Sequence, residues 1–310
     1  TLVVLIHLQR GEFDKALDAL GGWKKRDQQN PVVENFYGMA YLGKGETQTA
    51  RMHFEKALSL NPTFIGAALN LAQLDMTNKN PAAARKRLEG VLANDKSNVR
   101  AMLALARVAK LSGQDAEYLS WLQKALQANP AYLEPRRLLV EHQLSKGEAL
   151  KALTLAREGP VSNDPAALDL LGTAQMAAGQ KHNALVSYKQ LAEMAPRSPL
   201  VHYRLANVKQ ALGDLPGARK SLEQALELSP DYIDALVASL ALEMRSERYA
   251  QARAIAQRIR QKGPKNPLGP TLEGDAAVAQ RDYVAAVKAY EDAFRLRPDS
   301  LSMIKIHQAL

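Results

Sequence analysis

The sequence contains no cysteine and few aromatic residues, with five phenylalanines, two tryptophans and ten tyrosines among 310 residues. The lack of cysteine excludes disulfides and zinc sites built from thiolates. No run of about 18 apolar residues occurs, so the sequence predicts no membrane-spanning helix. The apolar opening at residues 1–7 is short and has no basic flank, so we interpret it as neither a signal peptide nor an anchor.

Catalytic constellations are also missing. The six histidines are isolated from one another and none belongs to a His-Glu-x-x-His motif, so each is interpreted as a surface or packing residue. The pair Gly43 and Gly45 lacks the spacing of a phosphate-binding loop, and no Gly-x-Ser-x-Gly elbow occurs. The sequence therefore predicts a protein that is not an enzyme and binds no cofactor or metal.

Positive charge is in modest excess. There are 41 basic and 32 acidic residues, which gives a formal net charge of +9. The densest basic stretch runs from Arg245 to Lys265 and points around most of a helix rather than along one stripe. We interpret this stretch as a solvated outer face, in preference to the alternative of a nucleic-acid surface, and predict no nucleic-acid partner.

The most prominent pattern that is present is an alanine repeated every 34 residues. One step, between Ala152 and Ala184, is 32 residues long, and Tyr118 is the only residue at this phase that is not alanine. The alanines are Ala16, Ala50, Ala84, Ala152, Ala184, Ala218, Ala252 and Ala286. A period of this length is typical of a stacked repeat array rather than of a single globular core.

Glycine and proline divide each repeat into two segments of about 13 residues with helical apolar spacing. With the recurring alanine at repeat position 20, glycine recurs at position 15, where a helix C-terminus requires positive φ. Proline recurs at position 32, where it separates one helix from the next. The glycines are Gly11, Gly45, Gly113, Gly147, Gly179 and Gly213; the prolines are Pro62, Pro130, Pro196, Pro230, Pro264 and Pro298.

Small residues at positions 8, 20 and 27, a bulky residue at 24 and proline at 32 resemble the tetratricopeptide repeat (TPR) pattern. Gly38, Ala50, Phe54, Ala57 and Pro62 are one instance; the usual tryptophan at position 4 is missing throughout. The resemblance implies an all-α TPR solenoid, a right-handed superhelix of antiparallel helix pairs. It implies one array over residues 1–310, with a partial unit 1–30, full units 31–64, 65–98, 99–132, 133–164, 165–198, 199–232, 233–266 and 267–300, and the start of another at 301–310.

Three places depart from the pattern. The loop at residues 159–165 ends a repeat that is two residues short, the prolines between 263 and 270 predict a late helix start, and Tyr118 replaces alanine. We interpret these departures as local changes of superhelical pitch; the alternative is that they are hinges or kinks of a binding site.

In TPR proteins the first helices line a concave groove through positions 2, 5, 9, 12 and 13. Transferred to this sequence, that implication gives a candidate partner-binding set of Asn35, Met39, Asn70, Gln73, Arg100, Arg107, Lys110, Arg137, Glu141, Thr173, Tyr203 and Asn207. Such a lining suits an extended peptide or protein partner with apolar anchors and an acidic group near the centre. The equal alternative is that these residues only confer solubility or contact other parts of a longer chain.

Two specialised grooves of the family are not matched. Of the residues of the carboxylate clamp found in chaperone-binding TPRs, only Asn70 and Arg100 fall in register, against Asn35, Met39 and Ala104. The asparagine ladder of glycosyltransferase-type TPRs would need asparagine at position 6 of most repeats, and only Asn70 provides it.

The segments 81–89 and 282–290 are similar to long bacterial TPR lipoproteins that accompany PEP-CTERM/exosortase sorting and exopolysaccharide loci. Apolar residues at both ends, such as Leu2 and Ile304, lead us to expect a fragment of a longer array. The resemblance implies a periplasmic or outer-membrane-associated scaffold whose membrane anchor lies outside this sequence. The alternatives are a cytoplasmic adaptor or regulator that binds a peptide and, as the weakest, a carbohydrate-binding groove.

Overall fold

The computed structural model describes residues 2–24, 27, 29–159 and 164–310, and these residues form nineteen α-helices and no strand. The helices are α1 (Leu2–Gln9), α2 (Phe13–Lys24), α3 (Pro31–Gly43), α4 (Thr47–Leu60), α5 (Ile65–Thr77), α6 (Pro81–Asn94), α7 (Val99–Leu111), α8 (Asp115–Ala128), α9 (Leu133–Ser145), α10 (Ala149–Arg157), α11 (Pro165–Ala177), α12 (Lys181–Met194), α13 (Pro199–Ala211), α14 (Leu215–Leu228), α15 (Ile233–Arg245), α16 (Tyr249–Lys262), α17 (Leu268–Ala279), α18 (Tyr283–Leu296) and α19 (Ser300–Ala309). The all-α architecture is as expected.

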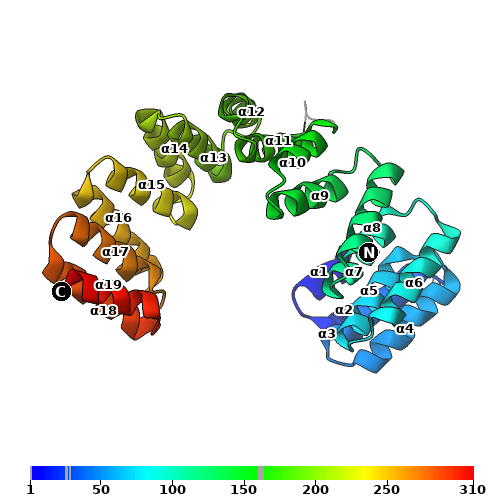
Figure 1. The fold of residues 1–310 in the computed structure, drawn as a ribbon. Helices are drawn as coiled ribbons and strands as arrows, with labels where there is room; N and C mark the ends of the chain where they lie inside the picture. The colour runs from blue at the N-terminus through cyan, green and yellow to red at the C-terminus, as the bar shows by residue number, and fades with distance from the viewer. Residues whose placement is uncertain (1, 25–26, 28, 160–163) are drawn as a thin grey trace. The chain divides into compact units, whose positions relative to one another are not determined.

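The helices form two compact units. Unit 1 spans residues 1–146 and contains α1 to α9, and unit 2 spans 147–310 and contains α10 to α19 (Figure 1). Within each unit consecutive helices pack together, and first helices of neighbouring repeats also touch, as α5 does with α7 and α13 with α15. The boundary between the units falls inside the repeat at 133–164, so a single array over 1–310 stays a prediction. Residues 160–163, in the shortened repeat's loop, lie outside the described residues.

Helix boundaries follow the breakers in the sequence. Each proline of position 32 lies in a connection between helices, as predicted, and α17 begins at Leu268, one residue later than its repeat. Several first turns are capped by side chains that accept a backbone N–H, such as Asn98 from Ala101 and Asp282 from Ala285. These local signals set where each helix begins, and packing of the apolar faces supplies the rest of its stability.

Position 15 adopts a positive φ in all nine repeats, including the partial one. The six predicted glycines have φ between 72° and 86°, and the three repeats without glycine place Lys79, Glu247 and Arg281 there at 57°, 58° and 58°. A left-handed conformation costs a residue with a side chain about 1–2 kcal/mol relative to a right-handed one. The repeat therefore imposes this turn whether or not the residue favours it.

Replacing Lys79, Glu247 or Arg281 by glycine is expected to raise the free energy of unfolding by about 0.5–1 kcal/mol per site. Urea denaturation of the single and triple variants measures this. The matched control is Lys44→Gly, because Lys44 precedes such a turn with φ −78° and glycine there should be neutral or destabilising. Equal effects at Lys44 and Lys79 would refute the explanation from backbone conformation.

The recurring alanine is fully buried in every repeat where it occurs, and Tyr118 at the same position is 2% exposed. The small residue of position 8 packs against the bulky residue of position 24 in the same repeat. A methyl group on Gly38 would lie 2.4 Å from the Phe54 ring, and one on Gly274 would lie 2.4 Å from the Tyr290 ring. A small residue at position 8 therefore makes room for the ring at position 24.

Two buried carboxylates each join neighbouring repeats through arginine residues. Asp75 on α5 pairs with Arg51 of the preceding repeat at 2.8 Å, and Glu243 on α15 pairs with Arg219 of the preceding repeat at 2.9 Å. Both acids stand at repeat position 11, and each follows its arginine by 24 residues. Asp75 has a second arginine partner in Arg87, and Glu243 has one in Arg248. Burial raises the pKa of Glu243, but the hydrogen bonds from Arg248 and Arg219 outweigh it and hold that pKa below its usual value.

Candidate functional site

A concave site lies in unit 1, over α7 and its neighbours α5 and α9. A hollow of about 410 Å³ is lined by apolar and aromatic side chains together with three basic ones. The apolar and aromatic members are Leu69, Leu103, Ala104, Ala106, Tyr118, Tyr132 and Leu138; the charged members are Arg100, Arg107, Lys110 and Glu134. Sites of this size and composition are typical of ligand pockets.

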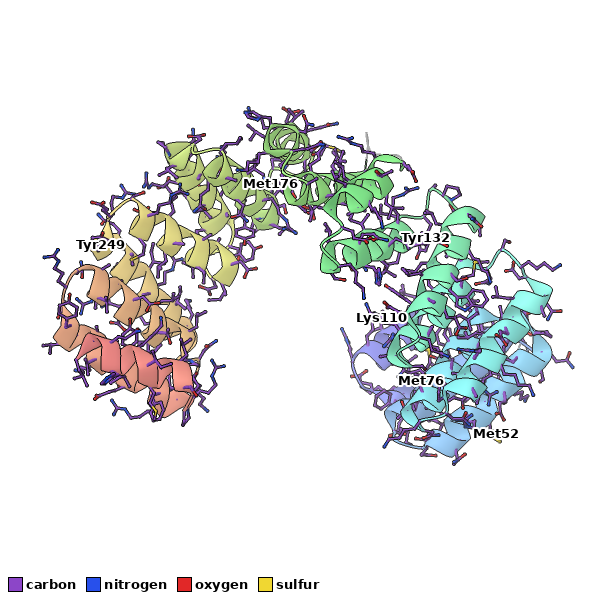
Figure 2. All side chains as sticks on the ribbon, in the orientation of Figure 1. Met52, Met76, Lys110, Tyr132, Met176 and Tyr249 are labelled. Atoms are coloured by element: carbon purple, nitrogen blue, oxygen red, sulfur yellow. The ribbon has the colours of Figure 1, made fainter. Side chains whose placement is uncertain are left out.

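A second hollow of about 310 Å³ adjoins the first along α5 and α7. Leu69, Ala104 and Arg107 line both hollows, so the two form one continuous groove. The far part of the second hollow is lined by Asn70, Gln73, Met76, Leu88 and Leu111. In Figure 2 Lys110 and Met76 lie on this side of unit 1, and Met52 on α4 lies on the opposite side.

The basic rim of the first hollow is electrostatically uncompensated. Arg100, Arg107 and Lys110 are all exposed on α7, and within the described residues none of them forms an ion pair. The ammonium group of Lys110 lies 5.0 Å from the centre of the Tyr118 ring. Positive side chains without carboxylate partners beside an apolar surface can receive an acidic group at no cost in broken ion pairs.

Arg137, predicted as part of the same basic section, is engaged differently. Its guanidinium donates to Glu134 at 2.9 and 2.6 Å and also binds Glu141, both on its own helix α9. The hydrogen bonds to Glu134 hold the pKa of Arg137 above its usual value. The spacings of three and four residues would have signalled this pairing in the sequence. Arg137 is therefore already engaged by two carboxylates, Glu134 and Glu141, and is not a free cation beside the hollow.

Tyr118 supplies part of the wall of the first hollow. Its ring packs against His142 of α9, with ring centres 5.9 Å apart, and burial raises the pKa of its hydroxyl. Among the repeats only this one carries an aromatic residue at position 20. The departure from the alanine pattern thus places an aromatic ring in the wall of the first hollow.

The N-terminal candidates of the set form an amide cluster. Asn35 is buried, accepts a hydrogen bond from Asn70 at 3.0 Å, and donates to the sulfur of Met39 at 3.6 Å. Gln73 is exposed and lines the second hollow with Asn70. Asn70 and Gln73 are therefore accessible to a ligand, whereas the buried Asn35 holds Asn70 in position through their hydrogen bond.

The candidates in unit 2 lie on the first helices α11 and α13, and none of them lines the two hollows described above. Thr173 is hydrogen-bonded to the Tyr188 hydroxyl at 3.0 Å, and Tyr203 packs edge-on against Tyr232 with ring centres 5.5 Å apart. Asn207 is half-buried on α13. Their role in binding stays a prediction.

The basic stretch at 245–265 is largely neutralised within unit 2. Arg253 pairs with Asp282 at 3.0 Å, Arg260 with Asp292 at 2.7 Å, and Lys262 with Asp231 at 2.8 Å. These pairs favour the interpretation as a solvated outer face. Over the described ranges no cluster of potential metal ligands is found, and no helix there is long and apolar enough to cross a membrane.

A protein-family model described as tetratricopeptide repeat matches residues 41–107, 175–241 and 210–272, which together exceed half of the chain. The chain belongs to the tetratricopeptide repeat family. A curated relative, the tetratricopeptide repeat and J domain-containing co-chaperone DNJ1 of Fusarium oxysporum f. sp. lycopersici, is 28% identical over 226 residues. That match covers 73% of this chain and 39% of the relative's length.

Two solved structures share the fold. A tetratricopeptide repeat protein from Parabacteroides merdae gives a TM-score of 0.59 at 14% identity and covers 78% of this chain and 97% of its own. A human IFIT1 dimer with PPP-AAAA gives a TM-score of 0.56 at 17% identity. That match covers 99% of this chain and 79% of the IFIT1 chain. As a TPR solenoid, the chain has the architecture of a protein-interaction scaffold.

Proposed function

We propose that this TPR protein is a non-catalytic scaffold that binds an extended segment of a partner protein in the groove of unit 1. The observation that carries the proposal is the juxtaposition of Arg100, Arg107 and Lys110, none of them ion-paired, with an apolar hollow of about 410 Å³. Apolar side chains of the partner supply burial energy, and an acidic group engages the arginines through charge-assisted hydrogen bonds.

The double variant Arg100→Gln/Arg107→Gln is expected to weaken binding of an acidic partner peptide at least about tenfold, because two charge-assisted contacts are lost. The probes are peptides selected by the wild-type chain from a random phage-displayed library, and affinity is measured by fluorescence anisotropy. Affinity for the wild type should fall with rising salt, and the variant should lose much of that salt dependence.

The matched control is Lys86→Gln/Lys96→Gln, which removes the same charge from exposed residues that line neither hollow of the groove. This control should bind like the wild type. Selected peptides without acidic residues, or equal affinity for the groove variant and the wild type, would contradict the proposal.

We further infer a setting in the bacterial envelope, with a role in protein sorting or exopolysaccharide export. Support comes from the similarity of residues 81–89 and 282–290 to TPR lipoproteins of exosortase and exopolysaccharide loci. The second candidate is a cytoplasmic, co-chaperone-like adaptor, which the co-chaperone relative favours. Fractionation of cells that express the full-length gene separates them, since recovery in the cytosol alone would exclude the envelope setting.

A further inference from the structure

The two hollows of unit 1 meet at Arg107. This side chain lines both of them, as do Leu69 and Ala104, while Tyr118 and Tyr132 line only the first and Met76 only the second. A basic group with an apolar hollow on either side is therefore the central feature of the groove. The two hollows, of about 410 and 310 Å³, differ in size and in aromatic content.

The order of these surfaces along the groove specifies the order of groups in a ligand that fills it. Arg107 can neutralise one acidic side chain without breaking an ion pair, because no carboxylate among the described residues pairs with it. The hollow on each side removes apolar surface from water when a side chain enters it. Glu134, the one acid in the lining, is already bound to Arg137 and leaves the rim positive.

We propose that the segment bound in this groove carries one acidic side chain with a large apolar side chain on both sides of it. The acid binds at Arg107, an aromatic or other large apolar residue enters the hollow beside Tyr118 and Tyr132, and a second apolar residue enters the hollow beside Met76. This rests on the proposed function and adds to it the sequence motif that the partner must contain. Tyr118, in place of the usual alanine, is a specificity-determining residue of the first hollow.

The protein-side test is Ala104→Phe. Ala104 is half-buried on α7 between the two hollows, so a phenyl group there occupies space in the groove and leaves all its charges in place. Binding of the selected peptides should weaken at least about tenfold, with the far-UV circular dichroism and the unfolding midpoint kept as checks of folding. The matched control, Ala104→Ser, adds little volume and should bind like the wild type.

The peptide-side test changes the sequence of the selected peptide. Alanine at either apolar position flanking the acid should weaken binding to the wild type at least about tenfold. Asparagine or glutamine in place of the acid should weaken binding to the wild type and have much less effect on Arg107→Gln, because the contact is already absent there.

The outcomes separate the two proposals. Peptides that depend on the acid and on Arg107, but tolerate alanine on both sides and bind Ala104→Phe normally, would overturn the flanked-acid motif and leave the proposed function standing. A dependence on only one flanking residue would also overturn the motif. Failure of the wild-type chain to select any acidic peptide would overturn both.

Discussion

Gly38→Ala is expected to lower the free energy of unfolding of unit 1 by about 2 kcal/mol, because the added methyl group overlaps the Phe54 ring. Alanine in the interior of a helix normally gains about 0.5–1 kcal/mol over glycine. At Gly38, however, the new methyl carbon would lie 2.4–2.8 Å from three atoms of the Phe54 ring. Overpacking of this kind costs about 1–3 kcal/mol, or more where the backbones cannot separate, so the overlap outweighs the gain in propensity.

Gly90→Ala is the matched control. Gly90 also lies inside a helix, α6, but nothing stands within 4 Å of its added methyl group. This variant should be more stable than the wild type by about 0.5–1 kcal/mol. Urea unfolding midpoints of the two variants should therefore move in opposite directions.

A second comparison uses the residue pairs that other repeats of this chain carry at positions 8 and 24. Ala72 with Leu88, Ala106 with Leu122, and Ala206 with Leu222 show that alanine at position 8 is compatible with leucine at position 24. The double variant Gly38→Ala/Phe54→Leu should therefore be more stable than Gly38→Ala alone. Strict additivity of the two substitutions would show that the ring and the methyl group do not interact.

Sequence periodicity was sufficient to predict the fold because each repeat must satisfy the same local geometry. The glycines of position 15 were assigned positive φ, which the structure confirms at all six. The proline breakers between helices were also predicted correctly. Lys79, Glu247 and Arg281 were not singled out, because without glycine the same turn leaves no signal in the residue type.

The candidate site was less predictable, because the direction and partners of a side chain depend on contacts that the repeat frame does not describe. Arg107 and Arg137 both stand at groove positions, yet only Arg107 has no ion pair, since Glu134 and Glu141 hold Arg137. Tyr118 was recognised as a departure from the pattern, but its place in a hollow depended on the neighbouring helices α7 and α9.

The same limit applies to the ion pairs between repeats. An arginine at position 21 and an acid 24 residues later belong to different repeats, and nothing in the 34-residue pattern marks them as neighbours. Their burial was missed because charged residues are mostly exposed. The pair at Glu243 leads to the second large effect.

Removing both arginines that bind Glu243 is expected to lower the free energy of unfolding of unit 2 by about 3–5 kcal/mol. Glu243 is 4% exposed, and in Arg219→Met/Arg248→Met its carboxylate would stay buried without the cationic partners that bind it here. Adding Glu243→Leu should recover most of the loss, because an apolar side chain has no charge to desolvate. The charge-matched control is Arg245→Met/Lys265→Met, because both residues are exposed and neither forms an ion pair among the described residues. This control should change the free energy of unfolding by less than about 0.5 kcal/mol.

Acid titration gives an independent check of the same interaction. The pKa of Glu243 in the folded chain is lowered from its usual value of 4.5, so its ionised form stabilises unit 2 fully above that value and the stabilisation is lost as the pH falls through the folded pKa. The unfolding midpoint of the wild type should therefore fall more steeply below about pH 4.5 than that of Arg219→Met/Arg248→Met/Glu243→Leu. Parallel pH profiles for the two chains would show that the buried carboxylate contributes no net stability. The double arginine variant would then have to act through lost packing of the arginine stems, on α14 and at the N-cap of α16.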